Sequence, residues 1–301
     1  MTPDAMIKAP PHGLRRRLLA RVYRHPRLQL LLLIAPPAGW FGVIYLGSLA
    51  VLFVAAFWYL DPLTSAIKHD LTLKNFQTLL SNPIYRTITL RTVGTAALVT
   101  VLDALLAFPV AYYMARYAGT RTRAAMFILV MLPLWSSYLV RVYAWRVILG
   151  ENGPLEWTLS LFGIQNVVLY PSDIAIPIVF TYNWLPYMIL PIYAGLERLP
   201  TSLLEASGDL GARPWFTFRK IVMPLVFPAV VAGSIFTFSL TLGDYITPGL
   251  VSNSQFIGNV IYDSQGVAGN VPFAAAYAMV PVLIMAIYLV VARRLGAFDA
   301  L

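Results

Sequence analysis

The sequence predicts an all-α polytopic membrane protein with six transmembrane helices and both termini on the cytoplasmic side. Its 301 residues are 59% hydrophobic and only 12% charged, and the mean hydropathy of +0.71 is too high for a soluble domain of this length. Several apolar segments are longer than the roughly 20 residues that a helix needs to cross a bilayer. Only helices satisfy the backbone hydrogen bonds of such segments in lipid, so an all-α fold is expected.

Short polar stretches divide the chain into six apolar segments. The expected spans are residues 28–60, 92–115, 124–149, 174–196, 221–243 and 271–292. The first span is too long for a secretory signal, and we expect it to enter the membrane uncleaved near Pro36 and Pro37. Residues 61–91 contain the helix breaker Pro83 and are expected to form an external loop with a surface helix at residues 71–80.

The distribution of basic residues predicts the orientation. On the expected cytoplasmic side lie Lys8, Arg15, Arg16, Arg17, Arg21, Arg24, Arg27, Arg116, Arg121, Arg123, Arg198, Arg213, Arg219, Lys220, Arg293 and Arg294. The expected external segments hold Lys68, Lys74, Arg86 and Arg91. This asymmetry follows the positive-inside rule. It predicts a basic cytoplasmic segment, residues 1–27, followed by a membrane domain, residues 28–301, and it accounts for the net charge of +9 without nucleic acid.

Metal, disulfide and ATP-binding chemistry are not expected in this chain. It has no cysteine, and its three histidines (His12, His25 and His69) are scattered, so no ligand cluster is predicted. No G-x-x-x-x-G-K-[ST] motif occurs, so the chain is not expected to hold ATP. A membrane enzyme would need paired carboxylates or a histidine cluster near one face. Because neither is evident, we predict no enzymatic activity.

Signals for a short helix lie between the fourth and fifth spans. Ser202 and Glu205 have the spacing of a capping box, which predicts a helix over residues 203–210. Gly211 can take the left-handed conformation that closes a helix. Pro214 suits the first turn of a second helix. A two-turn helix is marginal in water, so we expect something to pack against it.

One face of this predicted helix is apolar and shallow. It is formed by Leu203, Ala206, Ser207 and Leu210. Such a face suits insertion into the groove of a partner protein. Capping and charge alone are equally consistent with an ordinary cytosolic loop at residues 198–224.

The spacing of this loop adds a family resemblance. The triplet E-A-S at residues 205–207, followed by Gly211, Ile221 and Pro224, resembles the EAA loop of ABC importer permeases, with Met223 in place of the usual leucine. In that family the loop is a coupling helix that sits in a cleft of the cytoplasmic ATPase subunit. The resemblance implies this role for Glu205, Ala206, Ser207, Gly208, Asp209, Leu210 and Gly211.

Ionisable residues at membrane depth are costly and predict either a function or a specific partner. Asp103, near the middle of the second span, either faces a cavity that takes a cation or makes a hydrogen-bonded helix contact. Asp244 and Tyr245 follow the fifth span, where a carboxylate beside an aromatic ring suits a polyamine through charge and cation–π contact; the alternative is a solvated loop acid. Arg141 and Arg146 point about 140° apart on a helix, so snorkelling explains them better than one shared site.

Aromatic residues of the third and fourth spans are further candidates for a translocation path. They are Trp135, Tyr182 and Trp184. Interface anchoring or packing explains such rings equally well. Prolines in the same spans are expected to kink the helices and free backbone groups that can line a cavity. These are Pro133, Pro177, Pro186 and Pro191.

Residues 139–155, 182–200 and 243–251 resemble permeases of the spermidine/putrescine importer branch, although opine and phosphonate importers share much of the pattern. The resemblance implies a type I importer permease of the bacterial inner membrane, forming half of the path for a small solute. It also implies a heterodimer with a second permease, an ATPase dimer that binds ATP and Mg²⁺, and an extracytoplasmic binding protein. The alternative classes are an importer permease for another solute, such as an amino-acid-like one, or a secondary transporter in which Asp103 relays an ion.

Overall fold

The computed structural model describes residues 26–164 and 167–296. The chain divides into two units, residues 1–54 and 55–301. The first unit contains α2 (Pro26–Trp40), the π-helix η1 (Phe41–Leu46) and most of α3 (Gly47–Ala55). Residues 29–55 are long and apolar enough to span a membrane. The predicted basic segment lies almost wholly outside the described residues.

The first span begins close to its predicted limit, since the apolar segment starts at Gln29 and the expected start was residue 28. Pro36 and Pro37 lie inside α2, and the expected membrane entry near them stays a prediction. A helix in lipid tolerates internal proline because local changes of helical geometry satisfy the freed backbone groups. The π-helical turn η1 follows these prolines within one turn.

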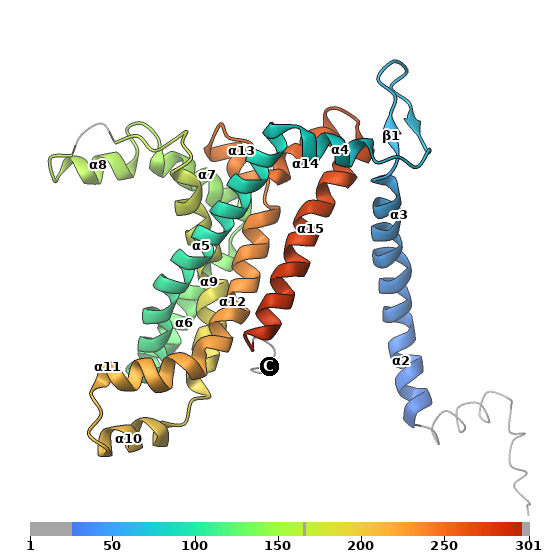
Figure 1. The fold of residues 1–301 in the computed structure, drawn as a ribbon. Coiled ribbons are helices and arrows are strands. Elements are labelled where there is room, and N and C mark those ends of the chain that lie inside the picture. The colour runs from blue at the N-terminus through green and yellow to red at the C-terminus, as the bar shows by residue number, and fades with distance from the viewer. Residues whose placement is uncertain (1–25, 165–166, 297–301) are drawn as a thin grey trace, which may run out of the picture. The chain divides into compact units, whose positions relative to one another are not determined.

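Three long helices form the centre of the second unit. They are α5 (Pro83–Arg116), α9 (Ala175–Glu197) and α12 (Met223–Gly243), which pack side by side (Figure 1). Small residues allow this close approach: a Cβ atom on Gly195 would lie 2.6 Å from the Cβ of Ala229, and one on Gly233 would lie 2.8 Å from the sulfur of Met188. Small residues at helix interfaces are typical of membrane bundles, where the backbones must come close to gain packing energy.

The second span is longer than predicted because α5 begins at Pro83. The side chain of Asn82 accepts a hydrogen bond from the backbone N–H of Ile84 at 3.0 Å, which caps the helix. Proline is favoured at the first helical position because its missing N–H is not needed there. Pro83 therefore starts a helix, whereas we expected it to break one.

The third span is broken. It consists of α6 (Thr120–Trp135) followed by α7 (Tyr138–Leu149), and the segments Thr120–Trp135 and Tyr138–Ser160 are bent by 96°. The break lies just after Pro133, where both the N–H and the hydroxyl of Ser136 bond back to the Pro133 carbonyl. A kink at Pro133 was expected, and the bend lies directly after this proline; with the bent pair counted as one span, the described residues contain up to six.

Short elements cover the end of the bundle that we predict to be external. A hairpin of β1 (Tyr59–Leu60) and β2 (Ile67–Lys68) is a small departure from an all-α fold. The expected surface helix is α4 (Lys74–Ser81). The other short helices are α8 (Pro154–Ser160), α13 (Ile246–Val251) and α14 (Ile257–Gly266). The last span is α15 (Val271–Arg294), close to the predicted limits.

The opposite end of the bundle carries α10 (Thr201–Asp209), α11 (Pro214–Thr217) and the π-helix η2 (Phe218–Val222) (Figure 1). α11, η2 and α12 follow one another without a break, so the fifth span extends from Pro214 to Gly243. The fifth span therefore begins within the loop that we expected to precede it.

Candidate functional site

The start of α10 differs from the predicted capping box. The N-cap residue is Pro200, in an extended conformation, and no side chain caps the helix. The N–H of Leu203 bonds to the carbonyl of Pro200 at 3.3 Å, so Ser202 already lies within the first turn. A proline at this position fixes the backbone before the helix. The prediction that Ser202 and Glu205 form the cap is therefore wrong.

The end of α10 forms as predicted. Gly211 has φ +74°, its N–H bonds to the carbonyl of Gly208 at 2.8 Å, and the N–H of Ala212 bonds to the carbonyl of Ser207 at 3.0 Å. This pair of bonds is a Schellman motif, which satisfies the last carbonyls of the helix. Gly211 is the residue that permits it, because side chains with a Cβ disfavour this backbone conformation.

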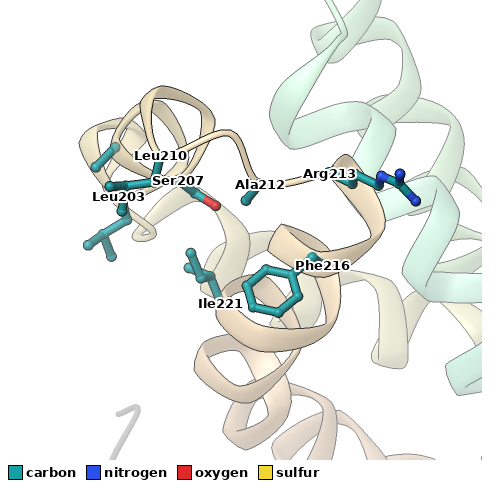
Figure 2. Close-up of a pocket in the computed structure, with 8 residues that line it drawn as sticks. Leu203, Ser207, Leu210, Ala212, Arg213, Phe216 and Ile221 are labelled. Carbon is teal, nitrogen blue, oxygen red and sulfur yellow. The ribbon is translucent and has the colours of Figure 1, made fainter.

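A groove of about 600 Å³ lies between α10 and the segment formed by α11 and η2. Figure 2 shows Ser207 of α10 on one side of it and Phe216 and Ile221 on the other. The full lining is Leu203, Ala206, Ser207, Leu210, Ala212, Arg213, Phe216 and Ile221. The predicted apolar stripe of α10 lines this groove, and its members Leu203, Ala206 and Leu210 remain exposed. Its insertion into a groove of a partner protein stays a prediction.

One side-chain hydrogen bond joins α10 to α11 beside this groove. The hydroxyls of Ser207 and Thr217 lie 2.7 Å apart, and Ser207 is only 6% exposed. Leu204, on the same side of α10, packs against the core cluster that contains Leu199 and Val222. Glu205, Gly208 and Asp209 are exposed on the other side. α10 is therefore fixed to the bundle on one face and open on the other.

A carboxylate and two aromatic side chains meet near the outer ends of the spans. The hydroxyl of Tyr138, at the start of α7, donates a hydrogen bond to the carboxylate of Asp244, just after α12. The same hydroxyl contacts that of Thr247. The ring of Trp184 stacks on that of Tyr138, with centroids 5.4 Å apart and an angle of 15°. The predicted residues Trp184 and Asp244 are thus brought together through Tyr138.

The backbone around Asp244 is also held closely. The N–H of Thr247 donates to the Asp244 carboxylate at 2.8 Å. A Cβ on Gly258 of α14 would lie 2.7 Å from the Asp244 carbonyl oxygen. The amide of Asn259 donates to the carbonyl of Tyr245 at 2.7 Å. Asp244 is therefore a fixed group, which contradicts the alternative of a freely solvated loop acid.

Burial raises the pKa of Asp244 above its ordinary value, and the hydrogen bonds from Tyr138 and from the backbone of Thr247 partly oppose this shift. A carboxylate that is desolvated in this way gains from a nearby cation. The arrangement can therefore bind a positively charged group beside aromatic rings.

The other predicted path residues are spread out. Tyr245 stacks on Tyr262, with centroids 4.8 Å apart, on the exposed side of this region. Tyr182 packs edge-on against Trp145 and lines a separate apolar groove between α6 and α9. Trp135, at the end of α6, is 83% exposed in this chain, and its expected place on the translocation path stays a prediction.

Asp103 is completely buried within α5. Within the described residues, neither carboxylate oxygen makes a hydrogen bond of normal geometry, although the hydroxyl of Thr181 lies beside it. None of the four described grooves includes Asp103. Both expected roles of Asp103, a cation-binding group facing a cavity and a hydrogen-bonded helix contact, stay predictions, and the neighbouring Thr181 hydroxyl is the candidate partner for the second.

Arg141 and Arg146 occupy separate places, as their spacing predicts. The guanidinium of Arg146 lies over the ring of Tyr170 at 4.8 Å. That of Arg141 lies over the ring of Tyr138 at 5.7 Å, and its Nε and Nη1 atoms are buried without a hydrogen-bond partner among the described residues. Snorkelling does not account for these two atoms, because they are buried.

Sequence reasoning missed Tyr138 altogether. It lies 106 residues from Asp244 in the chain. The local sequence offered only the position of Tyr138, three residues after Trp135 and directly after the two serines that follow α6.

The fold is thus a helical membrane bundle with a fixed helix at one end and a carboxylate–aromatic cluster at the other. The chain belongs to the family of binding-protein-dependent transport system inner membrane components, whose model matches residues 107–298. It is therefore an ABC importer permease of the inner membrane, and not an enzyme.

Two relatives illustrate the match. The chain is 47% identical over 293 residues to the inner membrane ABC transporter permease protein YdcU of Escherichia coli (strain K12), covering 93% of both chains. It is 31% identical over 228 residues to the spermidine/putrescine transport system permease protein PotB of Haemophilus influenzae, covering 74% of this chain and 79% of the relative.

Solved structures share the fold at low sequence identity. A chain of a bacterial alginate ABC transporter, solved with a periplasmic protein that holds an alginate pentasaccharide, has a TM-score of 0.68 and 17% identity, covering 94% of this chain and 98% of the other. A chain of the MetNI methionine ABC transporter has a TM-score of 0.54 and 17% identity, covering 72% and 96%. These likenesses show the fold alone.

Proposed function

We propose that this permease forms half of the translocation path for a polyamine such as spermidine or putrescine. The observation that carries the proposal is the Asp244 carboxylate, held by the Tyr138 hydroxyl beside the stacked ring of Trp184. A polyamine is a flexible chain of ammonium groups, which bind carboxylates by charge and aromatic faces by cation–π attraction. The relatives named as spermidine/putrescine permeases support the same solute class.

The proposed energy source is a separate ATPase dimer that binds ATP and Mg²⁺, while this chain binds no cofactor itself. In this proposal the exposed face of α10, with Glu205, Gly208 and Asp209, contacts the ATPase. The ATP cycle of the ATPase displaces α10, and the buried face of α10 transmits this displacement to the helix bundle. A second homologous permease completes the path, and an extracytoplasmic binding protein delivers the solute.

The first test is purification of the tagged chain in mild detergent from its native host, with identification and counting of the proteins that accompany it. We expect one second permease and two ATPase subunits. Recovery of the chain alone or as a homodimer, with uptake that does not require ATP, would overturn the proposal in favour of a secondary transporter.

The solute is tested in proteoliposomes that contain the purified complex and its binding protein. We expect ATP-dependent uptake of labelled spermidine or putrescine, strongly reduced in Asp244→Asn. Asp70→Asn is the matched control, because Asp70 is an exposed acid of the outer loop and loses the same charge. Equal uptake by wild type and Asp244→Asn would remove Asp244 from the path.

One observation favours a second candidate, a solute that carries a carboxylate as well as an ammonium group. Arg141 lies against the ring of Tyr138 with buried, unpartnered N–H groups, and these donors suit a carboxylate. An amino-acid-like solute would satisfy both Arg141 and Asp244. Uptake assays with labelled polyamine in competition with unlabelled ω-amino acids separate the two solutes, because only the second candidate predicts inhibition by the amino acid.

A further inference from the structure

Arg116, the last residue of α5, reaches across to a different part of the chain. One of its terminal nitrogens, Nη2, donates to the carbonyl of Leu196 at 2.7 Å and to the carbonyl of Leu199 at 2.8 Å. Both bonds are short and charge-assisted, so they are stronger than bonds between neutral groups. The side chain is half-buried, which reduces their screening by water.

The two accepting carbonyls mark the connection from α9 to α10. Leu196 lies in the last turn of α9, where its carbonyl also accepts from the N–H of Leu199 at 3.3 Å and the helix dipole favours a cation. Leu199 directly precedes Pro200, the N-cap of α10. Arg116 therefore binds the end of α5 to the end of α9 and to the linker that carries α10.

Besides the linker held by Arg116, a side-chain hydrogen bond also attaches α10 to the bundle. The Ser207–Thr217 hydrogen bond joins it to α11, which continues through η2 into α12. A displacement of α10 therefore reaches α12 through Ser207 and reaches α5 through the linker and Arg116. The neighbouring Arg123 differs from Arg116, because it donates to carbonyls at the end of α5 and in the turn before α6, those of Met114, Ala115 and Ala118. Its contact with α9 is an ion pair with Glu197 at 3.6 Å.

We propose that Arg116 is a positioning residue for coupling, which makes α5 follow the movement of α10. The proposal rests on the proposed role of α10 as the helix that receives force from the ATPase. α5 is the helix that carries the buried Asp103 and packs against both α9 and α12. Without Arg116, α10 would still meet the ATPase and still move α12, but the direct link from the α9–α10 linker to the end of α5 would be lost, and α5 would follow only through its apolar packing.

The test compares Arg116→Ala, Arg116→Lys and the control Arg121→Ala in the reconstituted complex. Arg121 is an exposed arginine in the first turn of α6 on the same side of the membrane. The measured quantity is the number of solute molecules imported per ATP hydrolysed. We expect Arg116→Ala to lower this ratio by about tenfold or more, because it removes both charge-assisted hydrogen bonds, while assembly and ATP hydrolysis persist. Arg116→Lys should recover part of the ratio, and Arg121→Ala should leave it unchanged.

A distance measurement separates a coupling role from a merely structural one. The chain has no cysteine, so spin labels can be placed at Ser202→Cys in α10 and at Gly119→Cys, where a Cβ meets open space beyond the end of α5. We expect one narrow distance in both nucleotide states, and a broad distribution once Arg116→Ala is added. Because these labels need only folded protein, they also report on Arg116→Lys if Arg116→Ala assembles poorly.

Two results would overturn the proposal: an unchanged transport ratio in Arg116→Ala, or an equal loss in Arg121→Ala. The Gly211→Val variant distinguishes this failure from failure of the docking role. If Gly211→Val lowers the amount of solute imported per ATP and Arg116→Ala does not, then α10 couples ATP hydrolysis to transport without Arg116. If neither variant changes the ratio, the docking role of α10 is itself wrong.

Discussion

The hydroxyl of Tyr138 donates a hydrogen bond to the carboxylate of Asp244, and so joins the broken third span to the outer end of the fifth. Replacing Tyr138 with Phe removes the donor but keeps the ring that stacks on Trp184. A hydrogen bond to a charged group contributes about 1.5–3 kcal/mol. We therefore expect Tyr138→Phe to lower the unfolding temperature of the purified chain and to raise the KM for solute uptake. Tyr143→Phe, an exposed ring in the same helix, is the control; equal effects of both variants would contradict a specific role for the hydroxyl.

Transport of a cation should depend on pH through Asp244. Because burial raises its pKa, the carboxylate gains a proton at a higher pH than an ordinary aspartate, whose pKa is about 3.9. The charged form binds the cation, so uptake should be full above the raised pKa and should fall as the pH drops through it. The measurement is the initial uptake rate against external pH. The fall should be absent in Asp244→Asn, and an identical fall in that variant would assign the pH effect to another group.

The left-handed backbone at Gly211 ends α10. Gly211→Val forces a β-branched residue into this conformation, which costs about 1–3 kcal/mol of strain. We expect normal insertion but fewer solute molecules imported per ATP, because the groove between α10 and α11 loses its shape. Gly119→Val is the control, since Gly119 has an ordinary backbone conformation and open space around it. Unchanged coupling in Gly211→Val would count against docking through α10.

The hydrogen bond between Ser207 and Thr217 can be measured directly. A double-mutant cycle with Ser207→Ala, Thr217→Val and the double variant isolates their interaction. We expect an interaction free energy of unfolding of about 0.5–1.5 kcal/mol, as is usual for a neutral hydrogen bond. Additive effects of the two substitutions would show that the hydroxyls do not interact.

Gly258 allows α14 to approach the backbone of Asp244. A Cβ at this position would lie 2.7 Å from the Asp244 carbonyl oxygen, closer than van der Waals contact allows. Gly258→Ala should therefore shift Asp244, reducing uptake and lowering thermal stability. Gly266→Ala, in the same helix but with open space around it, should leave both unchanged. Unchanged uptake and thermal stability in Gly258→Ala would mean that α14 can move away from Asp244 without affecting the site.

Much of the membrane topology was predictable because hydrophobicity and charge are local properties. The fourth and sixth spans, α9 and α15, lie within a few residues of their predicted limits. The errors arose at prolines. Pro83 starts α5 where a break was expected, and Pro200 takes the N-cap position of α10 that was expected for Ser202. The effect of a proline depends on whether a neighbouring side chain or carbonyl takes up the freed backbone groups, and the sequence alone does not show this.

The sequence by itself determined the class of protein, its apolar spans and the closing glycine of α10, since each depends on composition or on residues within a few positions of one another. Only the tertiary structure showed that Tyr138 donates a hydrogen bond to Asp244, 106 residues away, and that Arg116 donates one to the carbonyl of Leu196, 80 residues away. Such contacts depend on how helices pack and on where the third span bends. Local patterns carry no record of either, because the partners of a buried polar group are supplied by other helices.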